Sequence, residues 1–425
     1  QHAYPVICDW LGSRVQTEAG GGMLGQRSTG FLWERKKPLY IGEYLWVPIR
    51  DYSAGSVFFG DEAYLNRGEH TDRARVRAWT DQTLAYRRSG VSAMCPWSAF
   101  DFGGRPGKRR GYDEQKEFYR RVAAYLRTRD NRVFAGEKAT LEFDVFNDSA
   151  KTLSLELRLL RAGKTVASAT LVLEPAGYRP VSLAVEAPPV KGRKVFALEA
   201  VLLADGDEVH RAACSLGVEP KTELAAPAGT RLVTYDPAGT WPGSVKSLDG
   251  LAGAEAARTV LVVAPNALGK DSGGGVPVIG GTAFDTAAFT GFLRSGGRAV
   301  VLEQETLGPL GMGLRLVEHG STMTFPLNPR HPLLEGIGAG DLAFWRGDLY
   351  VARRQVVRPE SAGGRAIVVS GGPSSLDQAA VVEFPAGKGR LVLVQALVGG
   401  KYGTEPAARR LLANAVAYLA RWRPP

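Results

Sequence analysis

Cysteine is scarce in this sequence: Cys8, Cys95 and Cys214 are the only three in 425 residues. They are odd in number, widely scattered and outside any metal-ligand spacing, so neither a disulfide framework nor a zinc site is supported. Long apolar runs are missing too, because no stretch approaches the roughly 20 residues that a membrane helix needs. The start also lacks the charged and then apolar pattern of a signal segment. We expect no metal, no cofactor and no membrane span.

The composition is that of a globular protein. Apolar residues make up 44% and charged residues 23% of the chain, and 425 residues suffice for two or three domains with their own cores. The chain begins with Gln1 rather than Met, which indicates a processed product or part of a longer chain. The sequence leaves the oligomeric state open.

The net charge of +10 raises the question of nucleic-acid binding. The excess is spread over many arginines, and its densest cluster, residues 105–110, lies in a Gly/Pro loop without interleaved aromatic residues. We therefore expect no nucleic-acid partner.

The first of three compositional regimes, residues 1–130, holds two short strand patterns. Residues 37–46 (Lys-Pro-Leu-Tyr-Ile-Gly-Glu-Tyr-Leu-Trp) place Glu43 at the carboxyl end of a strand, and residues 90–102 repeat the format with Trp97. Residues 81–89 and 113–128 carry helical spacing. This rhythm of strand and helix is typical of parallel α/β architecture.

The second regime, residues 131–219, alternates with a period of two. Apolar side chains share one face in several runs, for example Leu153, Leu155, Leu157 and Leu159, and turn signals separate the runs. About seven strands in about ninety residues predict an immunoglobulin-like β-sandwich.

The third regime, residues 220–425, returns to α/β. Continuous apolar strands are expected at 231–235, 259–264, 298–303, 365–370, 380–384 and 390–395. Helices are expected at 285–295 and 405–422. Together these predict a flavodoxin-like, doubly wound parallel sheet.

Glu43 is the candidate for chemistry. Cleavage of a glycosidic bond usually needs two carboxyl groups, one as acid and one as nucleophile or base. A lone Glu at a strand end can also be a solvated loop residue. Its neighbours Tyr44 and Trp46, with Trp97 on the adjacent strand, favour a carbohydrate site because the apolar faces of sugar rings pack on aromatic side chains.

The first hundred residues resemble the end of the catalytic (β/α)8 barrel, or TIM barrel, of a large glycoside hydrolase clan that includes β-galactosidases, β-glucuronidases, mannanases and cellulases. The segment His2-Ala3-Tyr4-Pro5 is similar to the one that follows strand six in several of these families. Residues 39–43 resemble strand seven, and residues 91–97 resemble strand eight with its substrate-stacking Trp. The match covers about a quarter of the chain.

This resemblance implies a retaining hydrolase of β-linked glycosides with a carbohydrate substrate. Glu43 would be the nucleophile, and His2 and Tyr4 would orient it and contact sugar hydroxyls. Trp97 would be the platform at subsite −1, and Trp46 and Asp101 would lie at a subsite rim. The three cysteines do not reveal the compartment; a secreted or periplasmic location is favoured.

The chain departs from the family in one respect. The clan carries its acid/base Glu after strand four, usually in an Asn-Glu pair, and no such pair precedes Glu43. Asp61 and Glu62 could supply a carboxylate but are expected in the loop after strand seven. We therefore expect the acid/base half of the barrel to be absent and this chain alone to be inactive.

The third regime resembles the class I glutamine-amidotransferase-like modules appended to some large bacterial glycosidases. The similar segments are residues 331–334, 341–345, 387–390 and 406–414. Amidotransferase chemistry needs a Cys nucleophile, and none follows Cys214. His331 is expected to start a helix or lie in a loop, residues 272–275 to form a flexible loop, and residues 387–389 a hairpin turn.

Two other functions remain open. The protein could be a non-catalytic carbohydrate-binding or scaffolding protein, or its α/β domain could bind a small molecule at the switch point of the sheet.

Overall fold

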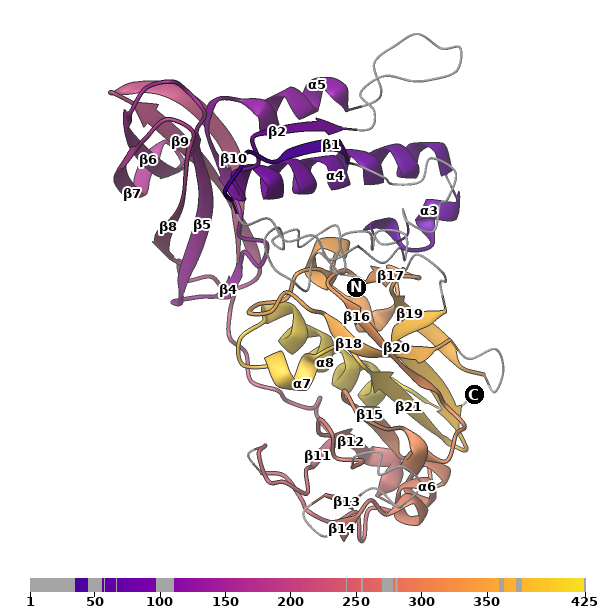
Figure 1. Cartoon of the computed structure of the whole chain (residues 1–425). Coiled ribbons are helices and arrows are strands. Elements are labelled where there is room, and N and C mark those ends of the chain that lie inside the picture. The colour runs from indigo at the N-terminus through magenta and orange to yellow at the C-terminus, as the bar shows by residue number, and fades with distance from the viewer. Residues whose placement is uncertain are drawn as a thin grey trace. The chain divides into compact units, whose positions relative to one another are not determined.

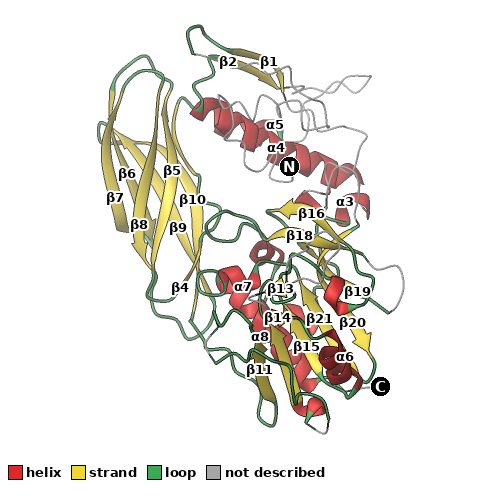
Figure 2. Ribbon diagram, turned by 60° about the horizontal axis from the view of Figure 1, so that its bottom comes forward, coloured by secondary structure: helices red, strands yellow, loops and turns green. Residues whose placement is uncertain are grey.

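The computed structural model describes residues 35–44, 56, 58–65, 67–96, 111–241, 243–253, 255–269, 278–279, 282–358, 363–371 and 377–423. The chain divides into two compact units, of which the first ends at Lys221 and the second begins at Thr222. Strands arranged in sheets predominate over helices in the described residues (Figures 1 and 2). The mixture of α/β and all-β parts expected from the sequence is confirmed at this coarse level, and the strands outweigh the helices.

The first unit opens with a parallel pair of strands. Strands β1 (Tyr40–Tyr44) and β2 (Ala93–Pro96) run in the same direction, and helices α3 (Glu62–Leu65) and α4 (Arg67–Arg88) lie between them in the chain. Helix α4 includes the predicted residues 81–88. Its buried apolar side chains are Ala74, Trp79, Leu84 and Ala85.

A two-sheet β-sandwich follows. One sheet has the order β4-β10-β9-β6-β7 and the other β3-β5-β8. All neighbours are antiparallel except β4 and β10. The strand bounds are β3 Val122–Leu126, β4 Arg132–Phe134, β5 Lys138–Asn147, β6 Leu153–Arg161, β7 Lys164–Leu173, β8 Gly177–Glu186, β9 Lys194–Ala204 and β10 Asp207–Glu219.

The alternation of the sequence explains the core of the sandwich. Leu141, Phe143 and Val145 of one sheet share a buried cluster with Leu157 and Leu202 of the other, and each is less than 2% exposed. Because successive side chains of a strand point to opposite faces, alternate residues of each strand enter this layer. The predicted period of two is therefore confirmed.

One helix predicted from the sequence is wrong in its second half. Residues 113–128 have apolar side chains at helical spacing, but only α5 (Tyr112–Gln115) and the 3-10 helix η2 (Lys116–Tyr119) are helical. Residues Val122–Leu126 form β3, which pairs with β5. The gain from burying Ala123, Ala124 and Tyr125 in a sheet overrides the local spacing. This strand of the sandwich thus comes from the segment that the sequence assigned to the barrel.

The second unit is built on a mixed sheet. Strands β11 (Arg231–Tyr235), β12 (Thr259–Val263), β15 (Arg298–Val301) and β21 (Gly389–Val394) lie side by side and parallel. The sheet continues with the antiparallel strands β20 (Gln378–Ala386), β18 (Ala352–Val357) and β16 (Leu316–Ser321). Strand β19 (Arg365–Val369) also pairs with β20, and β17 (Phe325–Pro326) pairs with β19. A separate short hairpin joins β13 (Val278–Ile279) and β14 (Thr282–Ala283).

Strands expected at six places in this unit are all present, but the expectation of an all-parallel sheet is wrong for its second half. Strands β20 and β21 are joined by Gly387 and Lys388 alone, since Ala386 pairs with Gly389. Two residues can connect only antiparallel neighbours, because a parallel connection needs a crossover of a dozen or more residues. The predicted hairpin turn at 387–389 is confirmed, and Gly387 adopts a positive φ of 61° there.

Helices cover both faces of the parallel strands. Val260, Val300 and Val392 pack with α8 (Pro406–Arg421) on one face. Leu261, Val301 and Leu391 pack with α6 (Thr286–Arg294) on the other. Both helices lie where the sequence placed them. The short helix α7 (Val398–Lys401) precedes α8, and the 3-10 helices are η3 (Ala256–Arg258), η4 (Gly308–Leu310), η5 (Pro332–Leu334) and η6 (Ala339–Leu342).

A buried carboxylate ties α8 to the sheet. One Glu383 oxygen on β20 accepts hydrogen bonds from Tyr418 Oη (2.7 Å) and from Arg390, whose Nη2 lies at 2.8 Å. His331 Nε2 lies 3.6 Å from the other oxygen, while His331 Nδ1 accepts the Leu333 N–H at the start of η5, which confirms its predicted position at a helix start. Burial alone would raise the pKa of Glu383, but the donors His331, Tyr418 and Arg390 outweigh it and lower the pKa to about 2.

The replacement Glu383→Gln should destabilise the second unit in a pH-dependent way. Because the folded-state pKa is below the usual 4.5, ionised Glu383 stabilises the fold above about pH 4.5, and this stabilisation declines as the pH falls toward 2. We expect the variant to lose about 3 kcal/mol of unfolding free energy at pH 7 and about half of that at pH 3, measured by urea denaturation. The exposed Glu318, which pairs with Arg354, serves as control: Glu318→Gln should cost less than about 1 kcal/mol. A loss for Glu383→Gln that is equal at both pH values would contradict this account.

Candidate functional site

The candidate site lies at the carboxyl edge of the parallel pair β1 and β2. The register pairs Tyr40 with Ala93, Ile41 with Met94 and Tyr44 with Pro96, with a shift between Ile41 and Tyr44. Glu43 is the penultimate residue of β1, so its backbone lies beside the end of β2. The two carboxyl ends meet at one edge because the strands are parallel. Parallel α/β enzymes hold their catalytic groups at such an edge.

The other site residues predicted from the sequence lie outside the described residues. These are His2, Tyr4, Trp46, Trp97 and Asp101, and the side chain of Glu43 is also outside the description. Their roles stay predictions. Residues 105–110 and 272–275 also lie outside. Asp61 and Glu62 are described: Glu62 opens the short helix α3 between β1 and α4, and Asp61 precedes it.

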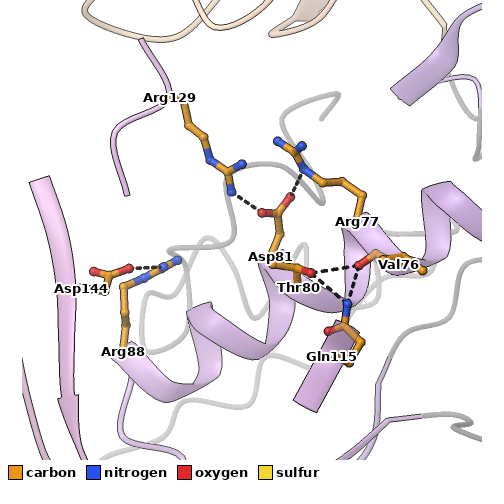
Figure 3. Close-up of polar contacts among 8 residues, drawn as sticks. All are labelled: Val76, Arg77, Thr80, Asp81, Arg88, Gln115, Arg129 and Asp144. Atoms are coloured by element: carbon orange, nitrogen blue, oxygen red, sulfur yellow. Dashed lines mark hydrogen bonds and ion pairs between the residues drawn. The ribbon is translucent and has the colours of Figure 1, made fainter. Parts of the chain in front are cut away.

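Helix α4 is held in place by a carboxylate between two guanidinium groups. Asp81, whose side chain is 2% exposed, contacts Arg77 Nε at 3.3 Å on the same helix and Arg129 Nη2 between β3 and β4 of the sandwich (Figure 3). Burial lowers the pKa of Arg77, as does the charge of Arg129, while Asp81 opposes both. The negative charge of Asp81 therefore lets two arginines approach each other at a partly buried position.

Two further arginines connect the end of α4 to the sandwich. Arg88 Nη1 donates to Asp144 Oδ2 on β5 at 2.8 Å, and the Asp144 side chain is 1% exposed (Figure 3). The other Asp144 oxygen accepts the hydroxyl of Tyr178 at 3.0 Å. Arg87 donates to Asp148 at 2.9 Å and to the carbonyl oxygens of Phe118 and Arg120. The helix that connects β1 to β2 is thus fixed against the β-sandwich by charge-assisted hydrogen bonds.

Hydrogen bonds of two further side chains, Gln115 and His210, complete this junction. Gln115 Nε2 on α5 donates to Val76 O at 3.1 Å and to Thr80 Oγ1 at 3.0 Å (Figure 3). His210 on β10 accepts the Ala124 N–H through Nδ1, and its Nε2 lies 2.8 Å from Glu117 on η2. Burial lowers the pKa of His210, although Glu117 acts in the opposite direction. A neutral His210 that donates from Nε2 satisfies both contacts.

The carboxyl edge of the parallel strands in the second unit is the alternative site that the sequence suggested. The side chains of Asp236, Glu303 and Gln304 at this edge make internal hydrogen bonds. Asp236, after β11, accepts hydrogen bonds from the backbone of Ala238, Thr240 and Trp241. Glu303, after β15, accepts the N–H groups of Gly399 (3.0 Å) and Gly400 (2.7 Å), and burial raises its pKa against these two bonds.

Gln304 also makes internal hydrogen bonds. Its Nε2 donates to the carbonyl oxygens of Ala264 and Leu302, and its Oε1 accepts the Leu268 N–H. These groups join neighbouring loops, so we do not assign a ligand to this edge. Among the described residues, no group of three or more His, Cys, Asp or Glu side chains is arranged to hold a metal ion. No described helix is both long and apolar enough to cross a membrane.

Comparison with known proteins gives limited similarity. No protein-family model and no curated protein sequence matches this chain. Solved structures with local similarity include the CARDB domain of a Pyrococcus furiosus protein (14% identity, 23% of this chain and 89% of that one, TM-score 0.19).

Glycoside hydrolases are also among these structures. A β-D-mannosidase from Dictyoglomus thermophilum is 15% identical over 44% of this chain and 23% of the enzyme, with a TM-score of 0.28. A β-glucosidase from Listeria innocua is 10% identical over 23% of this chain and 16% of the enzyme, with a TM-score of 0.18. This chain therefore spans less than a quarter of either enzyme.

The ion-pair cluster around Asp81 was not predicted from the sequence. The i, i+4 spacing of Arg77 and Asp81 was a usable signal for a pair on one helix face. Arg129 and Asp144 carry no such signal, because their partners are 48 and 56 residues away in the sequence.

The replacement Asp81→Asn tests whether this cluster holds α4. Removal of the charge leaves Arg77 and Arg129 to repel each other, so we expect the first unit to lose about 2 kcal/mol in guanidinium denaturation. Amide hydrogen exchange in α4 should accelerate with it. Glu69→Gln, which removes an exposed i, i+4 pair with Arg73 on the same helix, should cost less than about 0.5 kcal/mol. Equal losses in the two variants would show that Asp81 has no special role.

Proposed function

We propose that the first unit takes part in the hydrolysis of β-linked glycosides, with Glu43 as the nucleophile of a retaining mechanism. The observation that carries this proposal is the position of Glu43 at the carboxyl end of β1, beside the end of a second parallel strand. The helical crossover between the two strands supports it, since this is the repeating unit of a (β/α)8 barrel. We infer that residues 1–130 are built on the last strands of such a barrel.

The chemistry follows from one carboxylate. The Glu43 carboxylate attacks the anomeric carbon, the bond to the leaving oxygen breaks, and a glycosyl ester of Glu43 forms. Water then attacks the same carbon and releases the sugar with its original anomeric configuration. A second carboxyl group must protonate the leaving group and later activate the water, and we assign no residue to it.

Sugar recognition would come from the aromatic and polar residues near this edge in the sequence. Trp97 follows Pro96, the register partner of Tyr44, and Trp46 follows Glu43 by three residues. We propose Trp97 as the platform at subsite −1, His2 and Tyr4 as partners of Glu43 and of sugar hydroxyls, and Trp46 and Asp101 as rim residues.

We propose that the sandwich and the second unit are accessory domains. The antiparallel sheets β3-β5-β8 and β4-β10-β9-β6-β7, with β4 parallel to β10, favour an immunoglobulin-like sandwich for the region up to residue 219. We propose that residues 220–425 form an accessory domain that is similar to class I glutamine amidotransferases and lacks their cysteine. The alternative function is that of a non-catalytic carbohydrate-binding or scaffolding protein.

The test uses a substrate that needs no general acid. A 2,4-dinitrophenyl 2-deoxy-2-fluoro-β-glycoside has a leaving group that departs without protonation, so the nucleophile can react even where the acid is absent. We expect a panel of the β-mannoside, β-glucoside and β-galactoside inactivators to identify one sugar that labels the chain once. Peptide mass spectrometry should place the label on Glu43.

Two variants make the result specific. Glu43→Gln should abolish labelling, and Glu62→Gln, which changes an exposed acid in the connection after β1, should leave it unchanged. Labelling of a different carboxylate would refute the assignment of Glu43. Binding of the sugars without any labelling would favour the non-catalytic alternative.

A further inference from the structure

A cavity of about 850 Å³ lies in the second unit, at the edge of the sheet opposite to the one where doubly wound folds bind ligands. It is formed where the parallel strands begin: Thr230 precedes β11, Arg258 precedes β12, Arg298 opens β15 and Lys388 precedes β21. The last turn of α8 and the residues after it, up to Arg423, close one side. Its size is that of a small-molecule site.

The lining is strongly cationic. Five basic side chains contribute to it and no acidic one does; they are Arg258, Arg298, Lys388, Arg421 and Arg423. Four of these are exposed at the cavity, and Arg298 is buried, with 2% of its surface exposed. Five like charges around one cavity repel each other, and an anion bound between them relieves this repulsion.

Arg298 shows that the charge is not balanced from within. Its Nη1 donates to the carbonyl oxygens of Leu419 (2.9 Å) and Ala420 (3.0 Å) at the end of α8, and its Nη2 donates to Ala257 O. Its Nε is buried and has no hydrogen-bond partner. In the described part of the chain no carboxylate acts on Arg298; the one charge that does is the positive charge of Arg423. Buried arginines are normally paired.

The carboxyl end of α8, with its free carbonyl oxygens, lies beside the cavity. The end of a helix carries partial negative charge, which would disfavour an anion. Arg298 and Arg423 use this charge: Arg423 Nη1 donates to Ala420 O at 3.2 Å and to Trp422 O at 3.0 Å. The helix end carries only about half an elementary negative charge, so it offsets only part of the two positive charges of Arg298 and Arg423. The rest of their positive charge remains at the cavity.

We propose that this cavity binds a small sugar that bears a phosphate, sulfate or carboxylate group. Arginine guanidinium groups pair with such oxyanions through two parallel hydrogen bonds. The partly exposed Trp422 is the aromatic residue of the lining. The Arg390 guanidinium lies over its ring, 5.5 Å from the centroid, so a sugar ring would pack on the other face. The choice of a sugar as carrier of the anion rests on the proposed function, whereas the anion chemistry rests on the cavity alone.

Calorimetric titration of the whole chain tests this site with defined probes: glucose 6-phosphate, galacturonate, glucose, inorganic phosphate and a single-stranded oligonucleotide. We expect at least one of the two charged sugars to bind about tenfold or more tightly than glucose and than inorganic phosphate. The double variant Arg258→Gln/Arg421→Gln should weaken that binding about tenfold or more, because two charge-assisted hydrogen bonds are lost.

Matched variants show whether a loss of binding comes from the cavity or from a general loss of positive charge. Arg315→Gln/Arg330→Gln removes two exposed arginines of the same unit that do not line the cavity, and binding should not change. Glu43→Gln should also bind the charged sugar as before, so a failure of the glycosidase proposal is distinguishable from a failure of this one. Equal binding of glucose and the charged sugars would overturn the anion site. Phosphate or the oligonucleotide binding more tightly than either sugar, with loss in Arg258→Gln/Arg421→Gln, would overturn the sugar ligand.

Discussion

The parallel pairing of β1 with β2 is the constraint on which the proposed chemistry depends. Parallel strands cannot be joined by a short turn, so the chain must cross over through α3 and the 22-residue helix α4. The pairing also brings the carboxyl ends of both strands, and with them the backbones of Glu43 and Pro96, to one edge. A nucleophile must be held within a fraction of an ångström of its productive position. Because α4 connects β1 to β2, the contacts that fix α4 bear on the position of Glu43.

Those contacts combine ion pairs with an apolar cluster in which Leu84 packs with Tyr125 and Phe146 of the sandwich. Asp81 and Asp144 are nearly fully buried carboxylates, and each pairs with one arginine from a different element. Buried pairs of this kind add little net stability, but the loss of one member is costly because its partner is left uncompensated. They favour a single arrangement of helix and sandwich. The second unit uses the same device at Glu383, where Arg390 on β21 and Tyr418 on α8 converge on one carboxylate.

The sequence predicted the strands better than their arrangement. Alternating Leu residues in β6 and continuous apolar runs in β12 and β21 are unambiguous because burial on one or both faces dictates them. The segment 122–126 was misread, since Val122, Tyr125 and Leu126 fit a helical spacing as well as a strand and only the pairing with β5 decides. The turn at Gly387 was predicted from the sequence. The antiparallel pairing of β20 with β21, which a two-residue turn requires, was not. For the site, Glu43 was placed at a strand end from local pattern alone, whereas the partners of Asp81 and Arg298 depend on long-range packing that no local pattern records.

The central claim is that Glu43 is the nucleophile, and the stereochemistry of azide rescue tests it most directly. Glu43→Ala leaves space for azide at the position of the carboxylate, and a 2,4-dinitrophenyl β-glycoside of the sugar that labels the protein needs no acid to react. Azide should then attack from the nucleophile's side and give the α-glycosyl azide, identified by the anomeric proton coupling in its NMR spectrum. The formation of the β-glycosyl azide, or of no azide product while the wild-type chain reacts, would contradict the claim.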